Sequence, residues 1–72
     1  MADFEVRMDG YRYKGVHIRT YYGYDKNSII KAVKLDAQDD NADEFHIYYK
    51  GSMKSIGSWE KKGSRWYQTW PK

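Results

Sequence analysis

The chain has 72 residues, no cysteine and thirteen aromatic side chains, eight of them tyrosine. A chain of this length forms one domain, residues 1–72. It buries only about 60% of the surface that its unfolded form exposes, so a deep catalytic pocket is hard to build. Without cysteine there are no disulfides or thiolate metal ligands, and stability must come from packing of aromatic side chains.

The net charge of +3 is distributed unevenly. Five of the ten acidic residues fall in the segment 36–44, which has no lysine or arginine. The rest of the chain carries thirteen basic residues against five acidic ones. From residue 50 onward, six basic residues accompany Glu60 as the only acid. Asymmetry of this kind concerns the partners of a protein more than its fold.

The first part of the chain predicts two strands. Residues 4–9 alternate between apolar and charged side chains, which is typical of a half-buried strand. An Asp-Gly pair follows and predicts a hairpin, and the run 11–22 is dense in tyrosine and β-branched residues. The apolar phase changes at Gly15, which predicts a bulge or bend. Residues 23–27 are predicted to form a loop.

Residues 28–38 fit two patterns. As a helix, with Asn27 or Ser28 as N-cap, they form one apolar stripe of Ile29, Ile30, Val33 and Ala37. As a strand, they place Ile29, Val33, Leu35 and Ala37 on one face. The composition of the run suits helix propensity, so a helix is favoured, although Leu35 falls off the helical stripe.

The remaining chain predicts a three-stranded antiparallel meander. Its parts are a polar turn at 39–43, a strand at 45–50 ending at Gly51-Ser52, a strand at 53–60 loosened at Gly57, a four-residue hairpin loop at 61–64 and a strand at 65–70 ended by Pro71.

The elements together predict a small α+β domain of order ββαβββ, with one helix packed on a curved antiparallel sheet. A six-stranded all-β meander that closes into a small barrel remains the alternative. No stretch approaches the roughly 20 apolar residues of a membrane span. Residues 1–7 carry charges where a signal peptide needs its apolar run. We therefore expect a cytoplasmic protein without membrane contact.

Catalytic and metal-binding patterns are weak in this sequence. His17 and His46 have no further ligand at zinc spacing. An EF-hand loop started at Asp39 would have Glu44 in place of its glycine and Lys50 in place of its closing glutamate. There is no glycine-rich phosphate loop and no nucleophile elbow. A small ribonuclease with His46 as general base is a minor alternative, and we expect a non-enzyme without cofactor or metal.

Cations and aromatic rings alternate from residue 50 to residue 72. Cations attract phosphates, and aromatic faces stack on unpaired bases. On the last predicted strand Trp66 and Trp70 share one face, and Arg65 and Tyr67 share the other. If the tryptophans fill the core, Arg65 and Tyr67 lie on the outer surface. The leading hypothesis is therefore a nucleic-acid-binding module that favours single strands. Its candidate contact residues are Tyr48, Lys50, Lys54, Lys61, Lys62, Arg65 and Tyr67.

The same residue types also favour protein partners. Exposed tyrosine and arginine are typical hot-spot residues of protein interfaces. The alternative is a small protein-binding adaptor or inhibitor that acts through a tyrosine-rich sheet face or an edge strand. In size and composition the chain resembles the small regulators that phages and mobile elements encode. Self-association into a homodimer is a third hypothesis, because exposed strand edges favour pairing.

Overall fold

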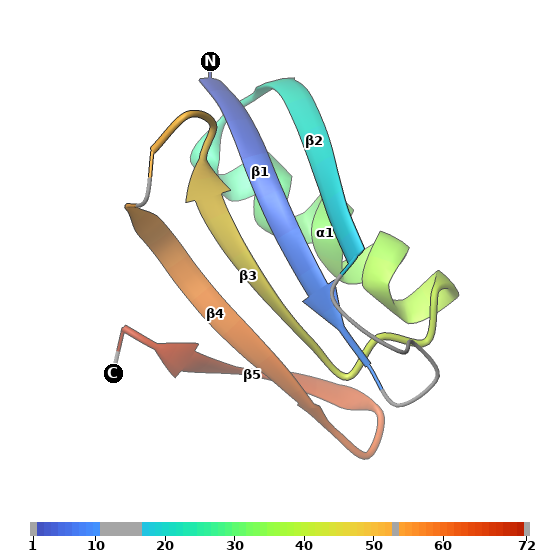
Figure 1. The fold of residues 1–72 in the computed structure, drawn as a ribbon. Coiled ribbons are helices and arrows are strands. Elements are labelled where there is room, and N and C mark those ends of the chain that lie inside the picture. The colour runs from blue at the N-terminus through green and yellow to red at the C-terminus, as the bar shows by residue number, and fades with distance from the viewer. Residues whose placement is uncertain (1, 11–16, 53, 72) are drawn as a thin grey trace.

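The computed structural model describes residues 2–10, 17–52 and 54–71. Its elements, in chain order, are β1 (Ala2–Asp9), β2 (His17–Tyr24), α1 (Lys26–Asp39), β3 (Glu44–Tyr49), β4 (Ser55–Lys62) and β5 (Arg65–Trp70). The strands form one antiparallel sheet in the order β2-β1-β3-β4-β5, and α1 covers one face of it (Figure 1). The predicted α+β fold is confirmed. The sheet is open, with β2 and β5 at its edges, and does not close into a barrel.

The helix resolves the ambiguity at residues 28–38. Its buried positions are Ile29, Val33 and Ala37, and Ile30, the fourth residue of the stripe expected for a helix, is partly buried against the core. Leu35, the residue that did not fit this stripe, is 65% exposed on the solvent side. The described chain contains no helix long and apolar enough to cross a membrane.

The helix begins earlier than the sequence indicated. Its N-cap is Asp25, where the sequence pointed to Asn27 or Ser28. The Asp25 Oδ1 atom accepts a hydrogen bond from the Ser28 backbone N–H at 2.8 Å. This bond lowers the pKa of the Asp25 carboxyl. Because β2 extends to Tyr24, the loop predicted at 23–27 shrinks to one residue between strand and helix.

The first two strands pair as predicted, but through a longer connection. Met8 lies opposite His17, so the Asp-Gly pair at the end of β1 does not close a tight turn. The predicted strand residues 11–16, together with the bulge expected at Gly15, lie outside the described residues.

The pairing of β3 with β4 shifts register beside Gly57. Ile47 lies opposite Gly57 and Tyr48 opposite Ser55, which leaves one extra residue in β4. The Ser55 hydroxyl bridges this bulge, since it donates to the Ile47 carbonyl and accepts from the Gly57 N–H, both at 3.2 Å. Glycine is needed here because a Cβ atom would lie 2.5 Å from the Trp59 ring.

The turn between β4 and β5 is tighter than predicted. Lys62 lies opposite Arg65, so the turn contains only Gly63 and Ser64. Gly63 has a φ of 65°, as the first residue of a two-residue type II′ turn requires. The four-residue loop predicted at 61–64 is therefore wrong, because Lys61 and Lys62 belong to β4.

The core lies between α1 and the sheet. Phe45 is central to its aromatic part, with ring centroids 5.1 Å from Trp59 and 5.0 Å from Trp66. Trp66 is partly buried against this cluster, whereas Trp70 is 49% exposed. The two tryptophans separate because a register shift near the end of β5 places Trp70 opposite Ser58. The buried apolar residues are Phe4, Val6, Met8, Tyr21, Ile29, Val33, Ala37, Ala42, Phe45, Ile47 and Trp59.

Candidate binding surface

The sheet face turned away from α1 has no covering layer among the described elements, and we call it the outer face (Figure 1). Phe4, Val6 and Met8 point toward the helix, so the residues that alternate with them point outward. Cross-strand partners share a face, which extends the assignment to the other strands. The outer face comprises Glu5, Arg7, Asp9, Ile18, Thr20, Tyr22, Glu44, His46, Tyr48, Ser58, Glu60, Lys62, Arg65, Tyr67 and Trp70.

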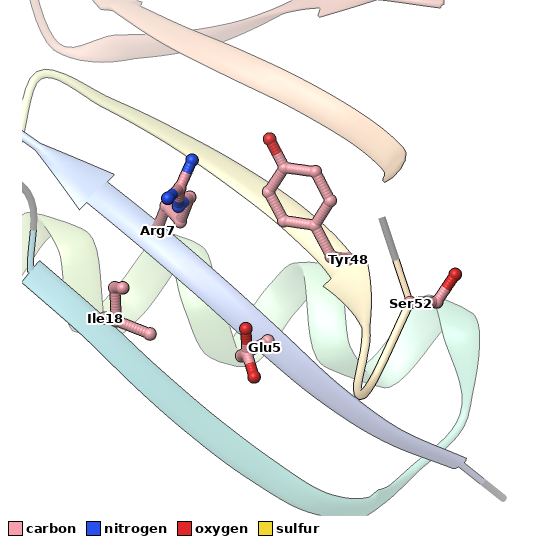
Figure 2. A pocket seen from close by; sticks show the side chains of 5 residues that line it. All are labelled: Glu5, Arg7, Ile18, Tyr48 and Ser52. Carbon is pink, nitrogen blue, oxygen red and sulfur yellow. The ribbon is translucent and has the colours of Figure 1, made fainter. Parts of the chain in front are cut away.

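A shallow depression of about 210 Å³ lies on the outer face. Figure 2 shows its lining side chains rising from the sheet on the side opposite the helix. The lining combines one carboxylate, one guanidinium, an apolar side chain and two hydroxyls, from Glu5, Arg7, Ile18, Tyr48 and Ser52. Both signs of charge in one open hollow suit a partner that is itself polar and apolar in parts.

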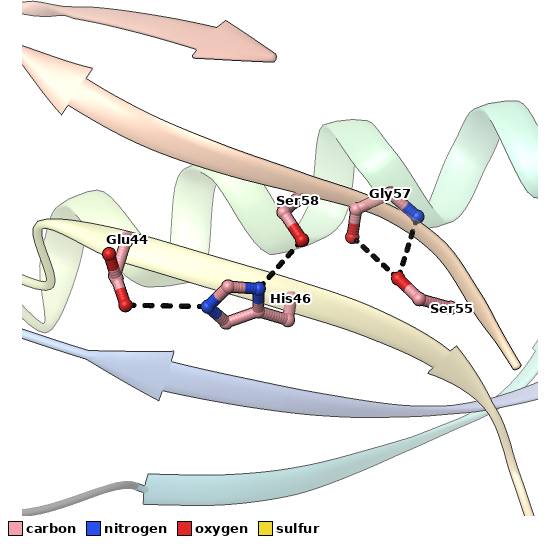
Figure 3. A network of polar contacts seen from close by, with 5 residues as sticks. All are labelled: Glu44, His46, Ser55, Gly57 and Ser58. Carbon is pink, nitrogen blue, oxygen red and sulfur yellow. Dashed lines mark hydrogen bonds and ion pairs between the residues drawn. The ribbon is translucent and has the colours of Figure 1, made fainter. Parts of the chain in front are cut away.

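A polar network crosses from β3 to β4 beside this depression (Figure 3). The His46 ring contacts the Ser58 Oγ through Nδ1 at 2.7 Å and the Glu44 Oε1 through Nε2 at 3.3 Å. The sequence could not predict this link, because the strand register alone brings Ser58 beside His46.

Carboxylate, imidazole and hydroxyl are the groups used in nucleophilic catalysis. Catalysis also needs aligned donors for an oxyanion and a site from which water is excluded. Here His46 and Glu44 have side chains that are 33% and 42% exposed, on an open strand face. The network links the side chains of two neighbouring strands.

Carboxylates form a row across one end of the outer face. Asp9 lies opposite Glu44, Glu44 opposite Glu60, and Glu60 opposite Tyr67. A second hollow of about 220 Å³ opens beside this row, between Asp9, Gly10, Asp43 and Glu44. Within the described parts of the chain, no three histidine or acidic side chains are grouped as metal ligands would be. This row would repel the phosphate backbone of a nucleic acid, because both are negatively charged.

The structure divides the predicted nucleic-acid contacts into three places. Tyr48, Lys62, Arg65 and Tyr67 lie on the outer face. Lys61 lies on the opposite side of β4, with its Nζ atom 5.9 Å from the Trp66 ring centroid.

The third place is the turn after β3, which holds Lys50 and Lys54. Lys50 lies one residue beyond β3, which ends at Tyr49, and its side chain is on the face of Tyr48, as expected. Its Nζ atom lies 4.6 Å from the ring centroid of Tyr22, on the outer face of β2. This turn and the hairpin tip lie at opposite ends of β4, roughly 23 Å apart at about 3.3 Å per residue. The seven predicted residues therefore do not form one continuous surface.

The outer face is not basic, although the C-terminal sequence is. Its cations are Arg7, Lys50, Lys62 and Arg65, and they are balanced by the carboxylates Glu5, Asp9, Glu44 and Glu60. Most of these carboxylates come from β1 and β3. Strand pairing brings Asp9 and Glu44 to the end of the sheet that holds Glu60 of the C-terminal hairpin, from which they are distant in sequence.

The fold and this surface define a small α+β domain with one open, aromatic sheet face of mixed charge. No protein-family model, no curated protein and no solved structure matches the chain.

Proposed function

We propose that the protein is a non-enzymatic binding module of the cytoplasm whose outer face docks on another protein. The observation that supports this proposal is the mixture of exposed apolar and aromatic side chains with charges of both signs. Ile18, Tyr22 and Tyr67 are 53%, 64% and 47% exposed on this face. Tyrosine and arginine are enriched at the centres of protein interfaces.

The charges of the outer face favour a protein over a polyanion. A nucleic-acid strand laid across Tyr67 would meet the row formed by Asp9, Glu44 and Glu60. A protein can place lysine or arginine against that row and a carboxylate against Arg7. Such complementarity raises specificity and association rate. The expected partner therefore has an apolar centre flanked by both signs of charge.

A retention experiment with two matched variants tests this proposal. Ile18→Asp introduces a carboxylate on the outer face, and Leu35→Asp makes the same change at an exposed apolar residue of α1. We expect one nuclease-insensitive protein from a lysate of the source organism to be retained by the wild type and by Leu35→Asp, but not by Ile18→Asp. Both positions are exposed, so both variants should keep the wild-type circular dichroism spectrum.

Two outcomes would contradict the proposal. One is a partner that Ile18→Asp retains as well as the wild type does. The other is a partner that both variants lose equally, because the outer face would then have no special role.

Nucleic-acid binding at the hairpin tip is a second candidate function. The specific observation is the cluster of Lys61, Lys62 and Arg65 around a two-residue turn, with Lys61 close to the ring of Trp66. Cations beside an aromatic ring suit a single strand whose bases stack while its phosphates bind. This candidate uses the tip of the hairpin and avoids the carboxylate row.

A further inference from the structure

The second edge of the sheet, β5, is open and nearly uncharged. It borders only β4 in the described sheet. Residues 66–70 contain no charged side chain, and Tyr67 and Trp70 are about half exposed. Soluble proteins usually protect an exposed edge with lysine, proline or a covering element. An edge without such protection along most of its length is available to a further strand.

The other edge, β2, is less suited to pairing. Its Arg19 is held by Asp36 of α1 and by the C-cap residue Asp40, at 3.5 and 3.2 Å. Near its end Gly23 has a φ of 74°, which interrupts the extended conformation. β5 keeps a regular register from Arg65 to Gln68, before the register shift that places Trp70 opposite Ser58, so it is the edge on which an added strand would find the longer regular stretch of backbone.

The hairpin fixes which backbone groups of β5 point outward. In a two-residue turn the flanking residues, here Lys62 and Arg65, form a hydrogen-bonded pair. Hydrogen-bonded and non-hydrogen-bonded pairs alternate along an antiparallel ladder. Arg65 and Tyr67 thus direct their N–H and C=O groups toward β4, whereas Trp66 and Gln68 direct theirs toward the open edge.

We propose that this edge binds β5 of a second copy, antiparallel, with a two-fold axis at Tyr67. In this register Trp66 forms a hydrogen-bonded pair with the partner subunit's Gln68, which uses the outward backbone groups of both. Tyr67 faces the partner subunit's Tyr67 in a non-hydrogen-bonded pair, where side chains approach most closely. Arg65 faces the partner subunit's Thr69.

The register is self-complementary in charge as well as in hydrogen bonding. The two Arg65 side chains lie at opposite ends of the shared ladder, so no like charges meet directly. A two-fold interface also closes on itself and cannot extend into a fibre. The product is one continuous sheet of twice the width, with both outer faces on the same side. This inference concerns the sheet edge and does not rest on what the outer face binds.

A cysteine variant tests the register directly, because the wild-type chain has no thiol. Directly opposed residues have Cβ atoms about 4.5–5.5 Å apart, closest in non-hydrogen-bonded pairs, and a disulfide spans roughly 3.5–4.5 Å. We expect Tyr67→Cys to form a covalent dimer under mild oxidation, seen on a non-reducing gel. The control is Thr69→Cys, whose thiols would be offset by four residues, about 13 Å along the ladder. It should stay monomeric on the gel.

Light scattering after size exclusion gives an independent measurement. The wild type is expected to become dimeric as its concentration rises. Tyr67→Lys should remain monomeric, because two ammonium groups would meet at the axis, while Glu60 accommodates the cation within each monomer. Tyr22→Lys, at an exposed tyrosine of β2, should dimerise like the wild type. A wild type that stays monomeric, a dimeric Tyr67→Lys variant, or equal cross-linking at positions 67 and 69 would overturn the proposed interface.

Discussion

At the scale of single residues, Tyr21 links the sheet to the helix through a hydrogen bond to Asp36. Its hydroxyl donates to the Asp36 Oδ2 atom at 2.5 Å, and Arg19 approaches Asp36 and Asp40 from the neighbouring position on the same face of β2. Two acids of the segment 36–44 thus link the C-terminal part of α1 to β2. Burial, followed by the bond to Asp36, raises the pKa of Tyr21 above its ordinary value near 10.

The raised pKa of Tyr21 predicts loss of stability in alkali. Above pH 10 the unfolded chain releases a proton that the native state retains, so the free energy of unfolding falls as pH rises. Tyr21→Phe lacks this proton and its bond, and it should be less stable at pH 7 by about 0.5–1.5 kcal/mol. Urea denaturation of both proteins from pH 7 to 11 measures the difference. We expect the difference to shrink above pH 10, and a constant difference would show that Tyr21 titrates normally.

At the scale of elements, the interiors of the helix and strands were predictable from the sequence, and their ends were not. The alternation of apolar residues located β1 and β3, and the stripe of Ile29, Val33 and Ala37 identified α1, because burial of one face repeats over several turns or pairs. An end depends on one side chain, as the capping by Asp25 shows. The predicted four-residue loop at 61–64 was wrong because this end also depends on a single residue. The positive φ of Gly63 allows a shorter turn.

The N-cap gives a prediction at this scale. Asp25→Ala removes the acceptor for the Ser28 N–H and should lower the free energy of unfolding by about 1 kcal/mol. Asn27→Ala, at a cap position that the sequence indicated, should change it by no more than about 0.5 kcal/mol. Chemical denaturation of the two variants distinguishes the positions. A larger loss in Asn27→Ala than in Asp25→Ala would mean that the helix begins where the sequence suggested.

At the scale of the whole molecule, the candidate site was only partly predictable. Alternation along β5 correctly predicted that Tyr67 and Trp66 lie on opposite faces of the sheet. The charge of the surface around it was missed, because Glu44 and Asp9 reach that end of the sheet only through the pairing of β1, β3 and β4. A composition count along the chain treats residues 50–72 as one basic region, whereas the register separates its lysines to two ends of β4.

That separation allows a charge-matched test of nucleic-acid binding. Lys61→Glu with Lys62→Glu reverses two charges at the hairpin tip, and Lys50→Glu with Lys54→Glu reverses two in the far turn, so both proteins have the same net charge. If the tip binds single strands, the first double variant should weaken binding by at least an order of magnitude. Its salt dependence should also flatten by roughly 1.4 in slope for two lost phosphate contacts.

Fluorescence anisotropy with labelled single-stranded DNA, RNA and duplex, each over a range of salt concentrations, measures both effects. The far-turn variant should retain most of the affinity, because Lys50 lies over Tyr22 at the other end of the sheet. Equal weakening in the two variants would mean that net charge alone drives binding. Absence of wild-type binding at low salt would remove nucleic acid as a partner and leave the outer face, with its exposed Ile18 and Tyr22, as the surface through which the protein acts.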